Sequence, residues 1–159
     1  MRIVNLILLL LLMGMLSYHW LLQDSELQGS RWTCNELSTN FISTPYQKYQ
    51  EIGERYVLYF ASSSNLTIFQ KGKLVFKNGE REKYEAIIDA DYKVTKDKIS
   101  VKYRKIDWHL KPQNAPVFIQ DLDSLKDFEM DLNFIISDEQ LYFHNRKNHE
   151  NTNFVCFAS

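Results

Sequence analysis

The stretch Asn78–Tyr92, NGEREKYEAIIDADY, decides the fold class of this chain. It begins with Asn-Gly, the strongest short-range signal for a β-hairpin, and this favours a type I′ turn at Asn78-Gly79. Beyond the turn the side chains alternate. Charged Glu85, Asp89 and Asp91 lie on one face, and apolar or aromatic residues lie on the other: Tyr84, Ala86, Ile88, Ala90 and Tyr92. A period of two predicts a half-buried antiparallel strand.

The flanking segments keep the same period and are rich in β-branched and aromatic residues. Ile99, Val101 and Tyr103 alternate, and Ile106 and Trp108 then continue in the opposite phase. We expect a β-bulge near Arg104-Lys105 to produce that change of phase. Further strands are expected at residues 29–37, 56–60, 66–69, 74–76, 132–136, 141–143 and 154–157.

Three other segments break the strand pattern. Ser38–Glu54 is long and polar and reads as a loop, and Lys111–Pro116 is a second loop with two prolines. In Asp121–Met130 apolar residues recur at three-residue spacing, which predicts one short helix with Asp121 or Asp123 as its N-cap. The chain is therefore predicted to be mainly β, forming a small antiparallel barrel or an open half-barrel with eight or nine strands and one short helix.

The two cysteines give a clue to the topology. In a closed barrel the first and last strands are neighbours, which would bring Cys34 beside Cys156. In an oxidising compartment one disulfide is the simplest state for such a pair. Two buried free thiols are the alternative.

The N-terminal run Ile3–Leu22 is almost wholly apolar and long enough for a helix to cross a hydrocarbon core of roughly 30 Å. Tyr18 and Trp20 lie where an interfacial aromatic belt belongs. The run lacks the small residues of a signal-peptide cleavage site, so we expect an uncleaved anchor, with a removed signal peptide as the alternative.

Charge sets the expected orientation of this span. Arg2 and the amino terminus precede it, whereas Asp24 and Glu26 follow it, which places residues 1–2 in the cytoplasm as a short tip. Residues 23–28 then form a linker and residues 29–159 a single domain on the far side of the membrane.

Composition excludes several function classes. With 19 Lys and Arg against 20 Asp and Glu, the chain is nearly neutral, and no basic stripe indicates direct nucleic-acid binding. The four histidines and two cysteines have no metal-binding spacing, and no nucleophile or phosphate-binding motif is present. We therefore expect no catalytic residues, no metal and no cofactor.

The surplus of aromatic residues suggests a ligand chamber, because small barrels either fill their interior with side chains or hold one apolar ligand. The alternative is that these residues form an ordinary core. The candidates to line the chamber are Tyr56, Leu58, Phe60, Phe69, Phe76, Tyr84, Ile88, Tyr103 and Trp108.

Several motifs carry a resemblance to a known family. The domain opens with Ser30-Arg31-Trp32 soon after the apolar run and continues through Lys71-Gly72-Lys73-Leu74. Phe128-Glu129-Met130-Asp131 precedes the segment Ile135–Phe143, and the chain closes with Phe154-Val155-Cys156-Phe157-Ala158-Ser159. This layout is similar to the ToxS-like family, including its VtrC branch, over nearly the whole chain. The Gly29-x-x-Trp32 start also resembles lipocalin-like barrels.

The resemblance implies a function. Members of the family are inner-membrane proteins with one span and a periplasmic domain, and they pair with a ToxR-type single-span transcription regulator of virulence genes. In the VtrC branch the two periplasmic domains form a lipocalin-like barrel that receives a bile salt. A free-standing anchored carrier, or a binding protein of the lysozyme-inhibitor type, is the alternative function.

Overall fold

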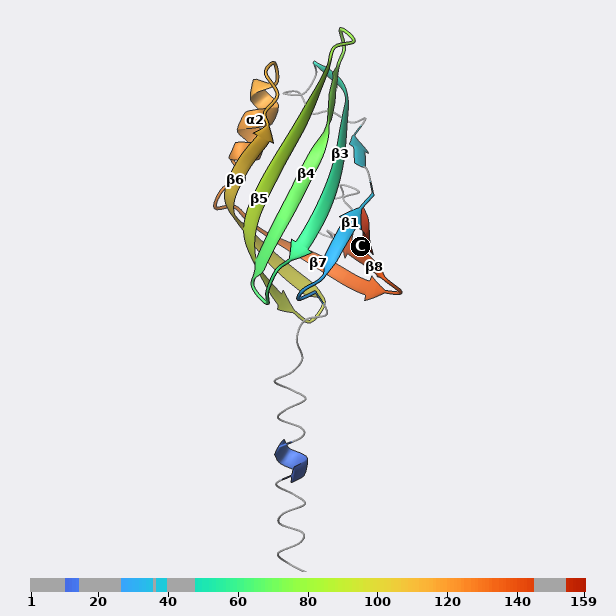
Figure 1. The fold of residues 1–159 in the computed structure, drawn as a ribbon, viewed down its shortest axis with the longest axis vertical. Coiled ribbons are helices and arrows are strands. Elements are labelled where there is room, and N and C mark those ends of the chain that lie inside the picture. The colour runs from blue at the N-terminus through green and yellow to red at the C-terminus, as the bar shows by residue number, and fades with distance from the viewer. Residues whose placement is uncertain (1–10, 15–26, 36, 40–47, 145–153) are drawn as a thin grey trace, which may run out of the picture.

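The computed structural model describes residues 11–14, 27–35, 37–39, 48–144 and 154–159. Its β-strands and its helix occupy these segments: β1 Arg31–Cys34, β2 Leu37–Thr39, β3 Tyr49–Phe60, β4 Asn65–Phe76, β5 Arg81–Thr95, β6 Lys98–Leu110, α2 Pro116–Asp123, β7 Glu129–Ser137, β8 Gln140–His144 and β9 Phe154–Ala158. The fold is mainly β, as the alternating sequence predicts (Figure 1).

The expected membrane anchor lies mostly outside the described residues. Residues 11–14 are helical, and the side chains of Leu11, Leu12 and Met13 are exposed. The rest of the expected span 3–22, the tip 1–2 and the linker up to residue 26 are not described. Among the helices that are described, none has the length and apolar character needed to cross a membrane.

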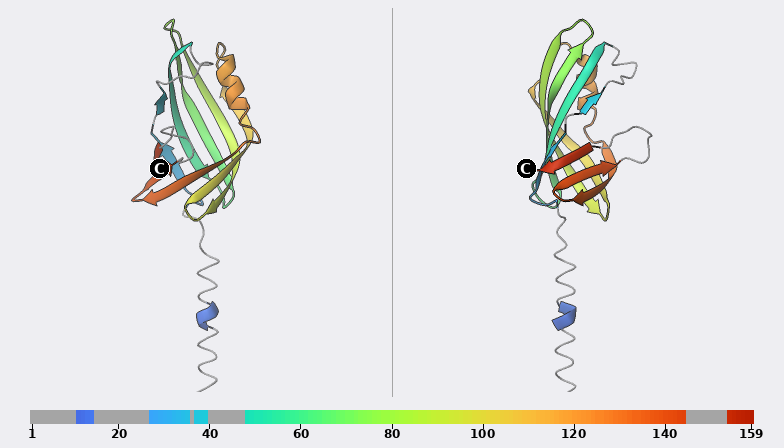
Figure 2. Two further views of the ribbon diagram at one scale, coloured as in Figure 1. Left: turned by 180° about the vertical axis from the view of Figure 1, so that it is seen from behind. Right: turned by 90° about the vertical axis from the view of Figure 1, so that its right-hand side faces the viewer.

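Eight antiparallel strands close into a barrel. They pair in the order β1-β9-β8-β7-β6-β5-β4-β3, and β3 pairs back to β1, while the short β2 adds to β3. The ring closes within this one chain, because β1 holds β3 on one side and β9 on the other. Figure 2 shows β7, β8 and β9 completing the barrel at one end only.

The two ends of the barrel differ. β7 pairs with β6 only over Lys98–Lys102, so the outer ends of β3, β4, β5 and β6 extend beyond the ring as a four-stranded half-shell. Helix α2 lies against this half-shell, with buried Phe118 in contact with the ring of Tyr84, centroid to centroid 4.7 Å (Figure 1). We call the two parts the closed ring and the half-shell.

Each part has its own hydrophobic cluster. The half-shell cluster is small and includes Tyr49, Leu74, Phe76, Tyr84 and Phe118. The larger cluster fills the closed ring: Leu27, Trp32, Cys34, Leu58, Phe60, Leu66, Ile68, Ala86, Ile88, Ala90, Tyr92, Ile99, Val101, Tyr103, Leu122, Leu132, Leu141, Phe143 and Cys156. Both clusters lie entirely within residues 27–159, so this barrel domain carries its own core and we treat it as a unit that folds by itself.

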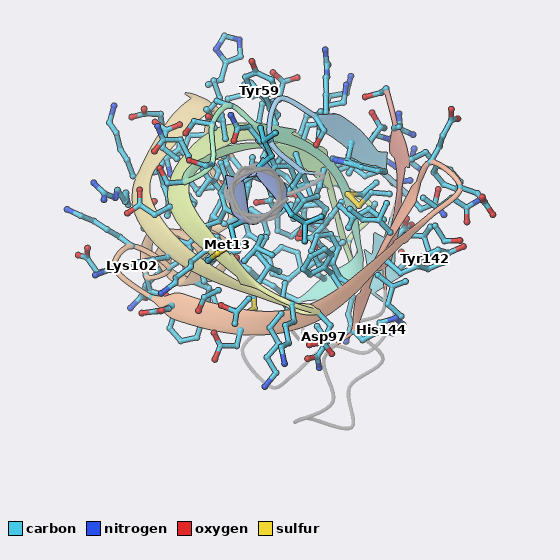
Figure 3. The ribbon with its side chains drawn as sticks, turned by 90° about the horizontal axis from the view of Figure 1, so that it is seen from below. Met13, Tyr59, Asp97, Lys102, Tyr142 and His144 are labelled. Atoms are coloured by element: carbon cyan, nitrogen blue, oxygen red, sulfur yellow. A yellow bond between two sulfur atoms is a disulfide. The ribbon has the colours of Figure 1, made fainter. Side chains whose placement is uncertain are left out.

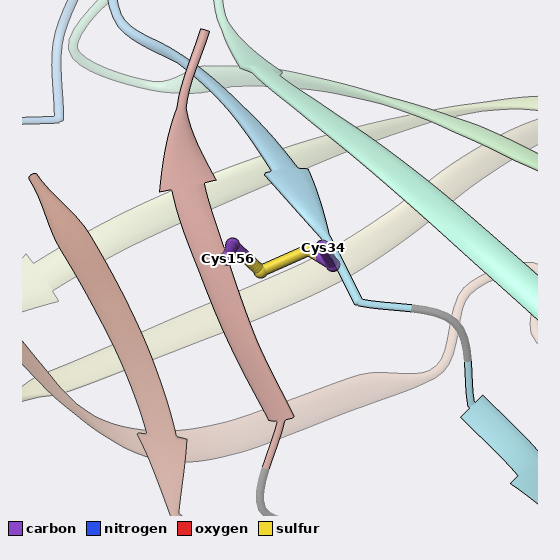
Figure 4. The surroundings of a disulfide bond; sticks show 2 residues. All are labelled: Cys34 and Cys156. Carbon is purple, nitrogen blue, oxygen red and sulfur yellow. A yellow bond between two sulfur atoms is a disulfide. The ribbon is translucent and has the colours of Figure 1, made fainter.

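Cys34 and Cys156 form a disulfide between β1 and β9 (Figure 4), which confirms the predicted pairing and excludes the free thiols. The two residues lie directly opposite each other in the ladder. The N–H of Asn35 donates to the carbonyl oxygen of Val155, so Asn35 and Val155 form a hydrogen-bonded pair of the ladder. The two cysteines therefore form the adjacent non-hydrogen-bonded pair, in which facing side chains are closest. The bond therefore joins the first and last strands of the closed ring.

The strands are longer than the sequence indicates. β2 covers Leu37–Thr39 and β3 begins at Tyr49, so the prediction of a loop over Ser38–Glu54 is wrong at its first two and its last six residues, and residues 40–47 lie outside the described part of the chain. β4 runs unbroken from Asn65 to Phe76, so the two short strands expected at residues 66–69 and 74–76 are one strand. Polar residues at inward positions, Glu54 and Gln70, interrupt the apolar alternation and hide this continuity.

The hairpin at Asn78-Gly79 exists, but its turn is not type I′. Gly79 has a φ of 88° whereas Asn78 does not have a positive φ, and type I′ requires positive φ at both. The Gly79 N–H donates to the carbonyl oxygen of Phe76, and the Phe76 N–H donates to that of Glu80. This is the three-residue loop in which a type I turn precedes a left-handed glycine.

The predicted bulge is confirmed, and the predicted helix is displaced. Asp89 pairs with Lys105 while Ala90 pairs with Tyr103, so Arg104 is the extra residue that reverses the phase of β6. Helix α2 begins at Pro116, five residues before the segment we expected, and no side chain caps its N-terminus. Proline favours the first helical position because its missing N–H has no partner there in any case.

Candidate functional site

The barrel interior collects most of the predicted chamber residues. Leu58, Phe60, Ile88 and Tyr103 are buried in the closed ring, while the half-buried Tyr56 and Trp108 pack against the same cluster. Phe76 and Tyr84 belong instead to the half-shell cluster. Seen from below, side chains fill the ring (Figure 3).

Phe69 does not belong to this interior, and its prediction as a chamber residue is wrong. Its neighbours Ile68 and Gln70 are buried, so the period of two turns Phe69 to the outer face, where 42% of its surface is exposed. The sequence misleads here because an apolar residue faces water while a polar one, Gln70, faces the core.

A polar cluster lies inside the barrel where the closed ring meets the half-shell. Its centre is the carboxylate of Glu54, on β3. The hydroxyl of Tyr56 donates to Oε2 over 2.7 Å, and the hydroxyl of Tyr84 donates to Oε1 over 3.3 Å. Gln70 Nε2 lies 3.4 Å from Oε1 and 3.3 Å from the Tyr56 hydroxyl. Three strands thus supply one hydrogen-bonded group, which we call the Glu54 cluster.

The cluster holds a carboxylate without a cation. No Lys, Arg or His among the described residues forms an ion pair with Glu54. Burial raises the pKa of Glu54, and the hydrogen bonds from Tyr56, Tyr84 and Gln70 only partly oppose that effect. Burial also raises the pKa of Tyr56 and of Tyr84, and the nearby Glu54 carboxylate raises both further.

A glycine contact fixes the position of the Tyr84 hydroxyl. A Cβ atom at Gly72 would lie 2.0 Å from the Gly53 carbonyl oxygen and 2.7 Å from the Tyr84 hydroxyl. Glycine is therefore required for β3 and the Tyr84 ring to approach β4 this closely. Gly72 thus makes room beside the Glu54 cluster for the Tyr84 hydroxyl.

Sequence reasoning missed Glu54 and Gln70. A signal was present, because the period of two places Ile52, Glu54, Tyr56 and Leu58 on one face of β3, and both Ile52 and Leu58 are buried. Gln70 follows Leu66 and Ile68 with the same spacing. The polar character of both residues argued against an inward position, although buried polar groups are acceptable where they are hydrogen-bonded.

Two further contacts tie the half-shell to α2. The indole N–H of Trp108 donates to Asp123 Oδ1 over 2.8 Å, and its ring lies against Phe118. Asp123 is thus a hydrogen-bond acceptor for a chamber candidate and not the helix N-cap that the spacing suggests. Deeper in the ring, burial raises the pKa of Tyr103 to about 12.

The Glu54 cluster places several hydrogen-bonding groups inside the barrel. Glu54 and Tyr56 lie on the inner face of β3 and are half-buried. A carboxylate, two phenols and one amide offer acceptors and donors to neutral polar groups such as hydroxyls. Among the described residues, no three His, Cys, Asp or Glu side chains lie together as a metal site.

No protein-family model matches the chain, and no curated protein matches it.

Proposed function

We propose that this chain is a binding subunit without catalytic activity, anchored in the bacterial inner membrane by residues 3–22 and carrying a periplasmic lipocalin-like barrel. It pairs with the periplasmic domain of a ToxR-type transcription regulator, stabilises its active state and thereby promotes virulence-gene expression. The family resemblance of the sequence supports the partner, and the closed barrel with the polar Glu54 cluster inside it supports a binding role.

The ligand we propose is an amphipathic molecule such as a bile salt, oriented by the Glu54 cluster. An uncompensated carboxylate repels an anionic head group, so the charged end of a bile salt points away from Glu54. The neutral hydroxyls of the steroid instead meet Glu54, Tyr56 and Tyr84, which supply both donors and acceptors. The polar cluster thus predicts selection for hydroxylated apolar ligands.

Signalling then follows from linkage across the assembly. A ligand that binds the assembled pair more tightly than the separate subunits shifts the population toward the pair. Because both partners are anchored in one membrane, their effective concentration is already high, and a modest coupling is sufficient.

A free-standing anchored carrier is the second candidate, and one observation favours it. The ring closes within this chain through the β1–β3 and β1–β9 ladders and the disulfide, so no second chain is needed to complete the barrel. Under that function the barrel domain binds its ligand as a monomer.

Co-expression separates the two functions. The barrel domain, residues 27–159, is produced in the periplasm alone and together with the periplasmic domain of a ToxR-type regulator, and each sample is passed over a size-exclusion column. A one-to-one complex supports the proposed partner subunit. Two separate monomers, with the bile salt bound by the barrel domain alone, support the carrier.

A further inference from the structure

A hollow lies on the outer face of the barrel, across the sheet from the Glu54 cluster, and Gln70 is among the residues that line it. Its volume is about 590 Å³, and it is lined by side chains from β1, β3, β4, β5 and β6. The ring of Tyr59 points outward, away from the interior (Figure 3). We call this feature the outer hollow.

The floor of the outer hollow is apolar although it faces water. Val57 lies opposite Phe69 in the ladder, and Phe69 lies opposite Ile87, so three apolar side chains form one continuous row. Tyr59 continues this surface with 41% of its area exposed, and Phe69 is 42% exposed. The outer face of an antiparallel sheet usually carries polar residues, so this row needs an explanation beyond folding.

The rim of the outer hollow is mainly basic. Arg31, Arg55 and Lys71 line it, against a single carboxylate, Glu85, whose Oε2 lies 3.9 Å from His109 Nε2. Arg31 and Lys71 form no ion pair with any residue that the structure describes. The hollow therefore attracts anions.

The volume of the outer hollow and the charge of its rim indicate which kind of ligand fits it. A volume of about 590 Å³ lies in the range of roughly 300–1,000 Å³ that is typical of small-molecule sites. A second copy of this chain is disfavoured, because a two-fold contact would bring the same basic rims together. We propose that the outer hollow binds one small amphipathic anion, a flat apolar ring system with a single sulfonate or carboxylate, independently of the barrel interior.

The aromatic and basic side chains of the outer hollow contact different parts of the proposed ligand. The rings of Tyr59 and Phe69 offer flat faces for stacking on the apolar body of the ligand. The acid group of the ligand accepts charge-assisted hydrogen bonds from Lys71 or Arg31. Removing the acid group from the ligand should therefore weaken binding, and removing the aromatic floor should weaken it whether or not the ligand is charged.

A matched pair of fluorescent probes tests this site on the barrel domain. 8-Anilinonaphthalene-1-sulfonate and N-phenyl-1-naphthylamine share one ring system and differ by the sulfonate. We expect the sulfonate probe to bind about tenfold more tightly at low salt. The double variant Arg31→Gln, Lys71→Gln should remove most of that difference, while Phe69→Ser should weaken both probes at least about fivefold.

Ile135→Ser is the control, because Ile135 is 55% exposed on β7 and does not line the outer hollow. It should change neither affinity. If Phe69→Ser alters the fold by circular dichroism, Tyr59→Ser takes its place. Equal affinity for the two probes, or sulfonate binding that survives both the floor and the rim variants, overturns the proposal whatever the barrel interior binds.

Discussion

At the scale of single residues, the feature with the largest consequence is Glu54. Its carboxylate is held inside the barrel by two phenols and an amide, with no cation among the described residues beside it. Burying a charge in this way costs free energy unless it is paired or protonated. We infer that the site is retained for recognition, because an apolar residue at this position would serve the core better.

The free-energy cost of the buried Glu54 charge can be measured by comparing the Tm of wild type and Glu54→Gln at several pH values. Because burial raises the pKa of Glu54 above the ordinary value of 4.5, the folded chain binds this proton more tightly than the unfolded chain does. The stability that the protonated carboxyl contributes is present below pH 4.5 and is lost as the pH rises through the raised pKa. Glu54→Gln should therefore raise the Tm of the barrel domain by a few degrees at pH 7.5.

That gain should shrink as the pH falls toward 4.5, where the wild-type carboxyl is protonated in the folded state. Thermal melts of both proteins from pH 4.5 to 8 measure the difference directly. Glu80→Gln, on the hairpin loop, is the matched control and should show no such trend. A difference between wild type and Glu54→Gln that is the same at every pH would show that Glu54 carries no raised pKa.

At the scale of single elements, the hairpins show where turn chemistry and sequence disagree. The β7–β8 turn places Asp138 at a φ of 47° and Glu139 at 63°, the type I′ pattern that we predicted for Asn78-Gly79. Residues with a Cβ atom are strained in this left-handed region, where glycine is not. The strongest turn signal in the sequence thus adopts another turn, and an unremarkable pair adopts type I′.

Glu139→Gly should therefore stabilise the barrel domain by about 1 kcal/mol, since it removes the strain at a positive φ. For a domain of this size that gain corresponds to roughly 2–4 °C in Tm. Urea unfolding and thermal melts measure it. The matched control, Glu80→Gly, lies after a turn where its own φ is not positive and should destabilise. Destabilisation by Glu139→Gly would mean that the turn is not type I′.

Most elements could be predicted from alternation, and the failures have common physical causes. The β5 face from Tyr84 to Tyr92 and the bulge at Arg104 were visible because apolar and polar residues changed places there. β3 was predicted too short, and Phe69 was predicted to face the interior, because the polar Glu54 and Gln70 were not expected at inward positions. They are tolerated there because they are hydrogen-bonded across the strands. Such partners come from distant segments, and no local pattern reveals them.

At the scale of the whole molecule, closure of the ring is the organising fact. β1 is short, yet it joins β3 to β9, and the disulfide lies at this seam. Cys34 and Cys156 are 122 residues apart in sequence, so the bond restricts nearly the whole barrel domain in the unfolded state. The cysteine pair was the feature of the sequence that best predicted the closed topology.

Removing this disulfide should cost stability without changing the fold. Chain-entropy models give about 4–5 kcal/mol for a loop of this length, which corresponds to roughly 10 °C in Tm. The double variant Cys34→Ala, Cys156→Ala should show this loss in thermal melts, while the wild type under reducing conditions should approach the same Tm. An unchanged Tm in the variant would show that the bond does not hold the barrel together.

We propose that the barrel couples an amphipathic ligand to a ToxR-type regulator. The most direct test is the Kd between the barrel domain and the periplasmic domain of a ToxR-type regulator, measured by calorimetry with and without a trihydroxy bile salt. We expect the ligand to tighten the complex at least about fivefold, as reciprocal linkage requires. A Kd that is unchanged by the ligand, or no association at all, would contradict this coupling.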